Sequence, residues 1–119
     1  MLKILFLILF VMSSVVFAQA QEKKEAYKFF EFEKISDSLL KEKFEQFYDE
    51  LKKETVLQGY IFNYGSEKEI AKRERKFRNL IVFRDHTWSR LTFVQCGNSS
   101  KLKTIFWIVP EGAEPPKSK

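Results

Sequence analysis

The amino-acid sequence predicts an α+β two-layer sandwich in which two helices cover one face of a mixed sheet. Strand-like and helix-like hydrophobic patterns alternate along the chain in the order β-α-β-α-β-β. Each helical segment carries one apolar stripe, which a helix must bury against another element. Right-handed crossovers would bring both stripes to the same face of the sheet. The 119-residue chain is long enough for one hydrophobic core and too short for two.

The first 20 residues are typical of a secretory signal peptide. Lys3 supplies a short positive region, Ile4 to Val11 is an unbroken apolar run, and Ala18 and Ala20 are the small residues that a signal peptidase requires. The apolar part is short for a membrane span of about 20 residues. We therefore expect cleavage after Ala20 and an exported protein, periplasmic or secreted, with no transmembrane span after cleavage.

The predicted domain covers residues 26–110, after a loose charged lead at 21–25. A short aromatic strand is expected at Tyr27 to Phe32. Ser36 can cap the first turn of a helix that runs to about Lys53. Within this helix, apolar residues recur at spacings of four, three and four, which produces a single stripe: Leu40, Phe44, Phe47 and Leu51.

The second half of the domain contains a strand, a helix and two further strands. Gly65 ends the first of these strands, and Ser66 with Glu69 forms the pattern of a capping box. Gly97 to Ser100 has turn composition, so the last two strands are expected to form an antiparallel hairpin. Prolines and Gly112 then end regular structure, and residues 111–119 are expected to be a disordered tail. The predicted elements are a strand at Leu57 to Tyr64, a helix to about Phe83, and strands at Arg90 to Cys96 and Leu102 to Val109.

Arg73 is the residue whose position most needs an explanation. At about 100° per residue, it lies within roughly 40° of the centre of the apolar side of the second helix. An unpaired charge cannot be buried cheaply, so its guanidinium must reach water, a carboxylate or a ligand. Two interpretations remain open: a snorkelling arginine whose methylene groups cover the sheet, or a ligand-binding arginine.

The helix pattern resembles that of the OmpA-like peptidoglycan-binding domain. Family members carry an arginine followed by spaced apolar residues and then a Ser-Arg-Ile segment that leads into a strand. Arg73, Phe77, Leu80 and Ile81 match the helix pattern, and Ser89-Arg90-Leu91 matches the segment after it. The resemblance extends over most of the mature chain and implies the fold predicted above.

The chain is also similar to a set of small exported bacterial proteins of unknown function. They share the motif GYI-x-x-YG, an arginine-rich helix and the motif WIVP-x-GA-x-PP. The matching residues here are Gly59-Tyr60-Ile61, Tyr64-Gly65, Trp107 to Pro110, Gly112-Ala113 and Pro115-Pro116. This similarity implies no particular activity.

The OmpA-like resemblance implies peptidoglycan as a ligand. In that family the helix arginine and an aspartate after the preceding strand hold the two ends of diaminopimelate, since guanidinium suits a carboxylate and a carboxylate suits an ammonium. Arg73 occupies the arginine position. No aspartate follows Tyr64, so Glu67 is the nearest substitute. The candidate ligand-binding residues are therefore Arg73, Glu67 and Ser66.

The remaining composition argues against catalysis, metals and cofactors. His86 is the only histidine and has only Asp85 beside it, too little for a metal site or a catalytic arrangement. Cys96 is the only cysteine, so it is expected to be a buried inert thiol or to have an intermolecular partner. The net charge of +5 is modest and mixed with acidic residues, so nucleic acid is not an expected partner.

Two functions follow as expectations. The first is a non-enzymatic binding module of the cell envelope that contacts the peptidoglycan stem peptide through Arg73, or another anionic envelope component through its basic face. The alternative is an OmpA-like fold that has lost this ligand and acts as a protein-interaction or structural domain. In that case a partner would use the sheet edge or the aromatic region around Trp107.

Overall fold

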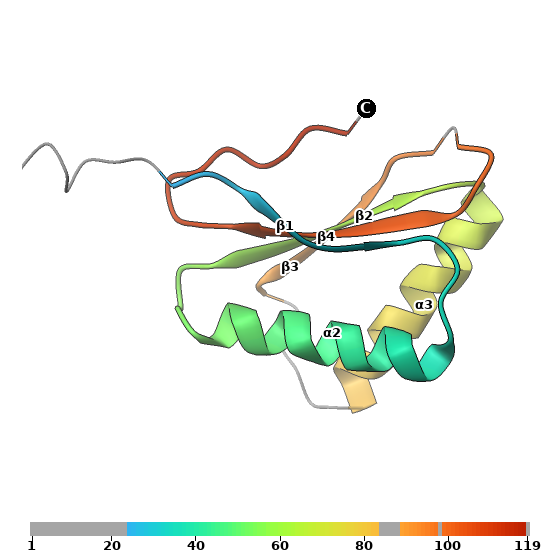
Figure 1. Ribbon diagram of the computed structural model, residues 1–119, viewed down its shortest axis with the longest axis horizontal. Helices are drawn as coiled ribbons and strands as arrows, with labels where there is room; N and C mark the ends of the chain where they lie inside the picture. Colours follow the sequence, from blue (N-terminus) through green and yellow to red (C-terminus); the bar gives the residue numbers. More distant parts are fainter. Residues whose placement is uncertain (1–23, 84–88, 98, 119) are drawn as a thin grey trace, which may run out of the picture.

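The computed structural model describes residues 24–83, 89–97 and 99–118 and forms the predicted α+β sandwich, with a four-stranded mixed sheet and two helices (Figure 1). The predicted signal peptide lies outside these residues. The element order β-α-β-α-β-β is confirmed, and the bounds lie within two residues of those predicted. The elements are β1 (Tyr27–Phe32), α2 (Asp37–Lys52), β2 (Gln58–Tyr64), α3 (Glu67–Phe83), β3 (Leu91–Gln95) and β4 (Lys103–Val109).

The sheet order is β1-β4-β2-β3, so the predicted hairpin of the last two strands is wrong. β4 lies between β1 and β2 and pairs antiparallel with both. β3 instead pairs in parallel with β2, with Gly59 opposite Leu91 and Asn63 opposite Gln95. The connection from β3 to β4 therefore crosses the end of β2, although its turn composition suggested a tight reversal.

Burial explains why β4 takes a central place and β3 an edge. Six of the seven residues of β4 are apolar or threonine, and five of the seven are buried. β3 has no fully buried residue. A strand that is apolar on both faces buries the most apolar area when it lies between two other strands. A strand with exposed side chains gives up less burial, and so less stability, when it lies at the edge of the sheet.

An aromatic cluster around Phe106 joins the sheet to both helices. The ring of Phe106 is fully buried, stacks on Phe47 of α2 at 4.7 Å, and meets Phe77 of α3 edge-on at 5.6 Å. Phe44 of α2 and Phe32 of β1 pack edge-on against the same ring. Because α2 and α3 contact the same side chain of β4, both helices cover one face of the sheet, as Figure 1 shows below the strands. We call this the inner face.

Two glycines permit close approaches that other residues would obstruct. A Cβ atom at Gly59 of β2 would lie 2.8 Å from side-chain atoms of both Leu51 and Phe47, so this glycine lets α2 pack directly on the sheet. Gly65 has a φ of 139° and its Cβ would lie 3.2 Å from the backbone of Leu102. Gly65 therefore allows the sharp turn from β2 into α3.

Both helix starts use the predicted serines. Ser36 Oγ accepts a hydrogen bond from the amide of Leu39 at 3.3 Å, and Ser66 Oγ accepts one from the amide of Glu69 at 3.2 Å. The capping box at Ser66 differs in one respect from the prediction. The Glu69 carboxylate accepts from the Ser66 hydroxyl at 3.0 Å, where a full capping box would bond the Ser66 backbone amide.

The end of α2 is held by Arg90, which lies just before β3. Its guanidinium donates to the backbone carbonyl oxygens of Leu51, Glu54 and Leu57, with the Nε–Leu57 bond at 3.0 Å. Leu51 lies in the last turn of α2, where carbonyl groups lack partners within the helix and a cation interacts favourably with the negative end of the helix dipole. Glu54 and Leu57 lie in the connection that follows, and the Glu54 carbonyl also accepts from the Leu57 amide. The sequence singled out Arg90 only through a family resemblance, yet its contacts give it a structural role.

Replacing Arg90 with alanine is expected to destabilise the protein by about 1–3 kcal/mol, since the half-buried carbonyls of Leu51 and Leu57 lose this donor. Urea unfolding followed by circular dichroism measures the change. Lys101→Ala, at an exposed position, is the matched control and should change the free energy of unfolding by less than about 0.5 kcal/mol. Equal effects of the two substitutions would contradict the capping role.

Candidate functional site

Arg73 of α3 is buried beneath the first connection of the chain, with 8% of its surface exposed. Nη2 donates to the backbone carbonyl of Glu33 at 2.8 Å, and Nη1 donates to Thr104 Oγ1 at 3.1 Å. The guanidinium carbon also lies 5.0 Å from the centre of the Phe32 ring. Within the described part of the chain, Arg73 forms no ion pair, so neutral oxygens and a ring face hold its charge.

Burial lowers the pKa of the Arg73 guanidinium from its usual value, and the nearby negative charge of Glu69 opposes this shift. An arginine nevertheless stays protonated in proteins. The charge is therefore retained at a site that is closed to water, which explains why both oxygen partners and the aromatic face are needed. The predicted snorkelling to solvent does not describe this geometry.

A row of polar side chains continues from Arg73 across the inner face of the sheet. Thr104 receives the bond from Arg73 and donates its own hydroxyl hydrogen to Asn63 Oδ1 on the neighbouring strand. Gln95, on the far side of Asn63, donates to Glu74 of α3 at 3.3 Å. Asn63 and Thr104 are fully buried, and Glu74 is 5% exposed. The row lies under the first half of α3. It continues the inner face of the sheet beyond the last apolar residues of the core, which are Phe106, Ile61 and Phe93.

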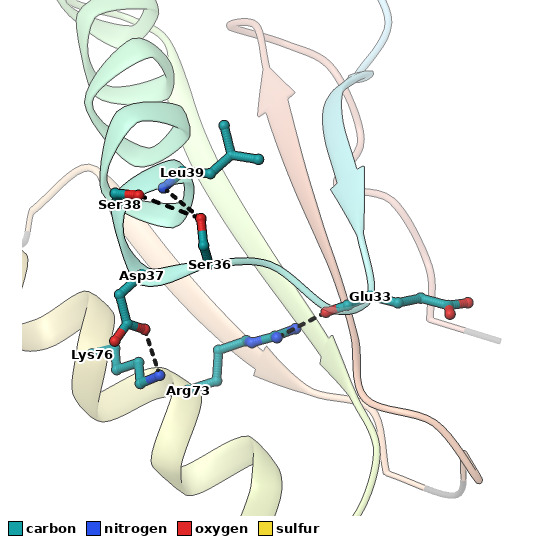
Figure 2. A network of polar contacts seen from close by, with 7 residues as sticks. All are labelled: Glu33, Ser36, Asp37, Ser38, Leu39, Arg73 and Lys76. Atoms are coloured by element: carbon teal, nitrogen blue, oxygen red, sulfur yellow. Dashed lines mark hydrogen bonds and ion pairs between the residues drawn. The ribbon is translucent and has the colours of Figure 1, made fainter.

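Figure 2 shows how α3 holds the connection between β1 and α2. Arg73 points to the carbonyl of Glu33, and Lys76, nearly one turn later, bonds the carboxylate of Asp37 at 2.8 Å. This hydrogen bond and charge from Lys76 lower the pKa of the exposed Asp37 carboxyl. Arg73 thus fastens the connection at Glu33 and Lys76 fastens the first residue of α2, and both contacts are structural.

The other two candidate ligand residues lie at the start of α3. Ser66 is engaged in the helix cap through Glu69. Glu67 is exposed in the first helical turn, and no ion pair joins it to Arg73 among the described residues. The structure therefore accounts for Arg73 and Ser66 without a ligand, and a binding role for Arg73, Glu67 and Ser66 remains a prediction.

The opposite face of the sheet, which we call the outer face, is unexpectedly apolar. The helices lie on the inner face, and a sheet with one free face usually presents polar residues there. Phe62 of β2, Ile105 and Val109 of β4 point outward, yet they are 2%, 6% and 5% exposed. Trp107 lies beside Phe62 with ring centres 6.4 Å apart. An apolar outer face in the two central strands indicates that something covers it.

The outer face carries a groove of about 1080 Å³ between the sheet and the C-terminal segment, residues 111–118. We call this the outer groove. Trp107, Tyr64 and Ile105 line its sheet side, and residues 112–117 line the opposite side. Lys28 lies 5.9 Å above the Trp107 ring, and Lys103 lies 4.8 Å above the Tyr64 ring. Both ammonium groups also lie near the carboxylate of Glu31, at 3.4 Å and 3.9 Å. The groove therefore combines aromatic faces with two lysines that share one glutamate.

Comparison with known proteins identifies no relative. No family model, no curated protein and no solved structure matches this chain. Function must therefore be inferred from the geometry, and the resemblance to the OmpA-like domain remains an expectation from the sequence.

No cluster of metal-binding side chains occurs in the part of the chain that the structure describes. Such a cluster would need three or more histidine, cysteine, aspartate or glutamate side chains close together. His86 and Asp85 lie outside the described residues. In the same described ranges, neither helix is long and apolar enough to cross a membrane.

Cys96, just after β3, is a free half-buried cysteine. Burial raises the pKa of its thiol, while contacts with Tyr64, Ser118 and Lys103 act in the opposite direction. The thiolate is the reactive form, so a raised pKa means slow chemistry at neutral pH.

We expect Cys96 in the folded protein to react with iodoacetamide at pH 7.5 several-fold more slowly than in the urea-unfolded chain, where the thiol has its ordinary pKa. Mass spectrometry of timed samples measures both rates, and a short cysteine peptide under each condition corrects for the effect of urea. A corrected folded rate equal to the unfolded rate would show that the thiol is neither buried nor perturbed.

Proposed function

We propose that this chain is an exported, non-enzymatic interaction domain of the cell envelope that binds a protein partner on its outer sheet face. The observation that carries the proposal is the outer groove, in which Trp107 and Tyr64 line one wall of a groove of about 1080 Å³. Aromatic side chains at partly exposed sites dominate many protein interfaces, because they bury a large area at low entropic cost.

The geometry of Arg73 supports this function over a stem-peptide contact. A ligand carboxylate would need the guanidinium to be open, whereas this one is 8% exposed and has its hydrogen bonds directed at Glu33 and Thr104. A ligand could reach the guanidinium only if the Glu33 carbonyl or Thr104 moved away, and the buried charge of Arg73 would then lose a hydrogen-bond acceptor that stabilises it. Arg73 is therefore proposed as a structural residue and the outer face as the binding surface.

Site-specific photocrosslinking in cells of the source organism tests the proposal. A photoreactive phenylalanine analogue is placed at Thr92, an exposed outer-face position of β3, and in a second variant at Arg75, an exposed position of α3. We expect a discrete crosslinked partner from Thr92 and none from Arg75. Adding Trp107→Ala to the Thr92 variant should reduce that crosslink at least fivefold. Equal crosslinking from both positions would overturn the proposal.

Sedimentation with purified sacculi separates the two functions that the sequence predicted. The proposal predicts no sedimentation above that of an unrelated basic protein. Arg73→Lys keeps the charge and is less disruptive than alanine, so it is the variant to compare. Specific sedimentation of the wild-type chain that Arg73→Lys abolishes would favour the stem-peptide function and contradict the one proposed here.

A further inference from the structure

The C-terminal segment 111–118 runs back across the outer face of the sheet. The chain reverses after β4, where the amide of Ala113 bonds the carbonyl of Pro110 at 3.1 Å. At the far end, Ser118 is close enough to Cys96 to affect the pKa of its thiol. Figure 1 shows the segment in red on the side of the sheet opposite the helices. Eight residues in an extended proline-type helix span about 25 Å, comparable to the length of β4.

The C-terminal segment 111–118 makes few contacts with the rest of the domain, although it lies over apolar residues of the sheet. It contains no helix or strand, and in the described range only the amide of Ala113 donates to a backbone carbonyl. Only Ala113 and Pro116 are half-buried, and the other residues of the segment are exposed. Segments with few buried contacts and few backbone hydrogen bonds open at low free-energy cost. The C-terminal segment, which we also call the cover, can therefore be displaced from the outer face without unfolding the domain.

The lining of the outer groove contains one buried donor without an acceptor among the described residues. Trp107 Nε1 is a buried donor and has no acceptor among the described residues. Trp107 lines the same groove as Tyr64, Lys28 and Lys103. The two ammonium groups share one carboxylate, that of Glu31, at 3.4 Å and 3.9 Å. A ligand suited to these groups offers a carbonyl oxygen to the indole, flat apolar rings to the aromatic faces, and a second carboxylate to the two lysines that share Glu31.

An extended proline-rich polypeptide with acidic residues has all three features. Its backbone carbonyls are free of internal hydrogen bonds, and its conformation is formed before binding, so aromatic grooves bind it at low entropic cost. The present cover has this composition, since Glu114 is followed by Pro115 and Pro116. The chain thus places a segment of this composition along the outer wall of its own groove.

We propose that the outer groove binds a proline-rich, acidic segment of a partner polypeptide, and that residues 111–118, which form the outer wall of the groove, close it until that segment displaces them. This inference rests on the proposed function, because it specifies the partner of the same surface. Because only molecules with an open groove can bind, the cover reduces the apparent affinity for the partner. The apparent Kd is the intrinsic Kd divided by the fraction of molecules in which the groove is open.

A peptide with the sequence of Glu111 to Lys117 is the probe, titrated into the full mature chain labelled with ¹⁵N. The indole N–H signal of Trp107, assigned with Trp107→Phe, reports binding. We expect the double variant Pro115→Gly/Pro116→Gly, in which the cover is loosened, to bind the peptide at least tenfold more tightly than the wild-type chain. The matched control is Lys101→Gly, a loosening outside the cover, which should leave the affinity unchanged.

Peptide variants test the chemistry of recognition. Replacing both prolines of the peptide with alanine should weaken binding at least fivefold, and replacing both of its glutamates with lysine should do the same. If the loosened variant binds no peptide, or binds the substituted peptides equally well, the inference is overturned. If photocrosslinking from Thr92 captures a partner in that case, the proposed function stands and only this inference fails.

Discussion

Replacing Arg73 with alanine is expected to lower the free energy of unfolding by about 2–4 kcal/mol, although the residue belongs to the basic helix. The substitution removes the donor to Thr104, and the hydroxyl of Thr104 in turn bonds the fully buried Asn63. It also leaves the Glu33 carbonyl without its partner and opens a cavity beside Phe32. Each unsatisfied buried polar group costs about 1–3 kcal/mol, and the cavity adds to this. Urea unfolding measures the loss.

Arg75→Ala is the matched control for Arg73→Ala, because it removes the same side chain from an exposed position of the same helix. It should change stability by less than about 0.5 kcal/mol. Arg73→Lys should fall between the two, since an ammonium retains the charge and cannot reproduce the planar fork that reaches two oxygens. An Arg73→Ala chain as stable as Arg75→Ala would show that the arginine is not part of the core and would reopen its role as a ligand contact.

Replacing Phe106 with alanine should cost about 3–5 kcal/mol, the largest single effect expected in this protein. Its fully buried ring contacts Phe32, Phe44, Phe47 and Phe77, which come from β1 and both helices. Removing the ring therefore creates a cavity where all layers of the domain meet. Thermal and urea unfolding, followed in the near ultraviolet for aromatic packing, would measure the change.

Phe83→Ala removes the same side chain from the end of α3, where the ring is 75% exposed. This control should change stability by less than about 0.5 kcal/mol. A comparable loss in the two variants would mean that the aromatic cluster around Phe106 is not the centre of the core, and would contradict the packing of both helices on one face.

The elements of this fold could be predicted because they depend on local patterns. The spacing of Leu40, Phe44, Phe47 and Leu51 predicted α2, and each of these residues is buried. Ser36 and Ser66 marked the helix starts through hydrogen bonds that span only three residues. The pairing of β3 with β4 was wrong because turn composition describes the connection alone. Which strands pair depends on the competition of all strands for central positions.

Part of the candidate site was also visible in the sequence. Periodicity placed Arg73 on the apolar side of its helix, and the structure confirms its burial. Its partners, Thr104 and the carbonyl of Glu33, are 31 and 40 residues away and could not be inferred from spacing. The sequence indicated the aromatic region around Trp107 as a surface for a partner, but the groove itself was not predicted, although a signal existed. The nearly continuous apolar runs of β2 and β4 lack the alternation of a half-exposed strand, which indicates burial on both faces.

The sequence by itself determined the order of helices and strands, the serine caps and the location of a charge on an apolar helix face. These follow from periods and hydrogen bonds within a few residues, which a linear pattern contains. Only the tertiary structure decided that β4 is central, that neutral oxygens enclose Arg73, and that residues 111–118 cover the outer face. These depend on contacts between distant segments, where burial of apolar area on both faces of the sheet outweighs the local preference of any one turn.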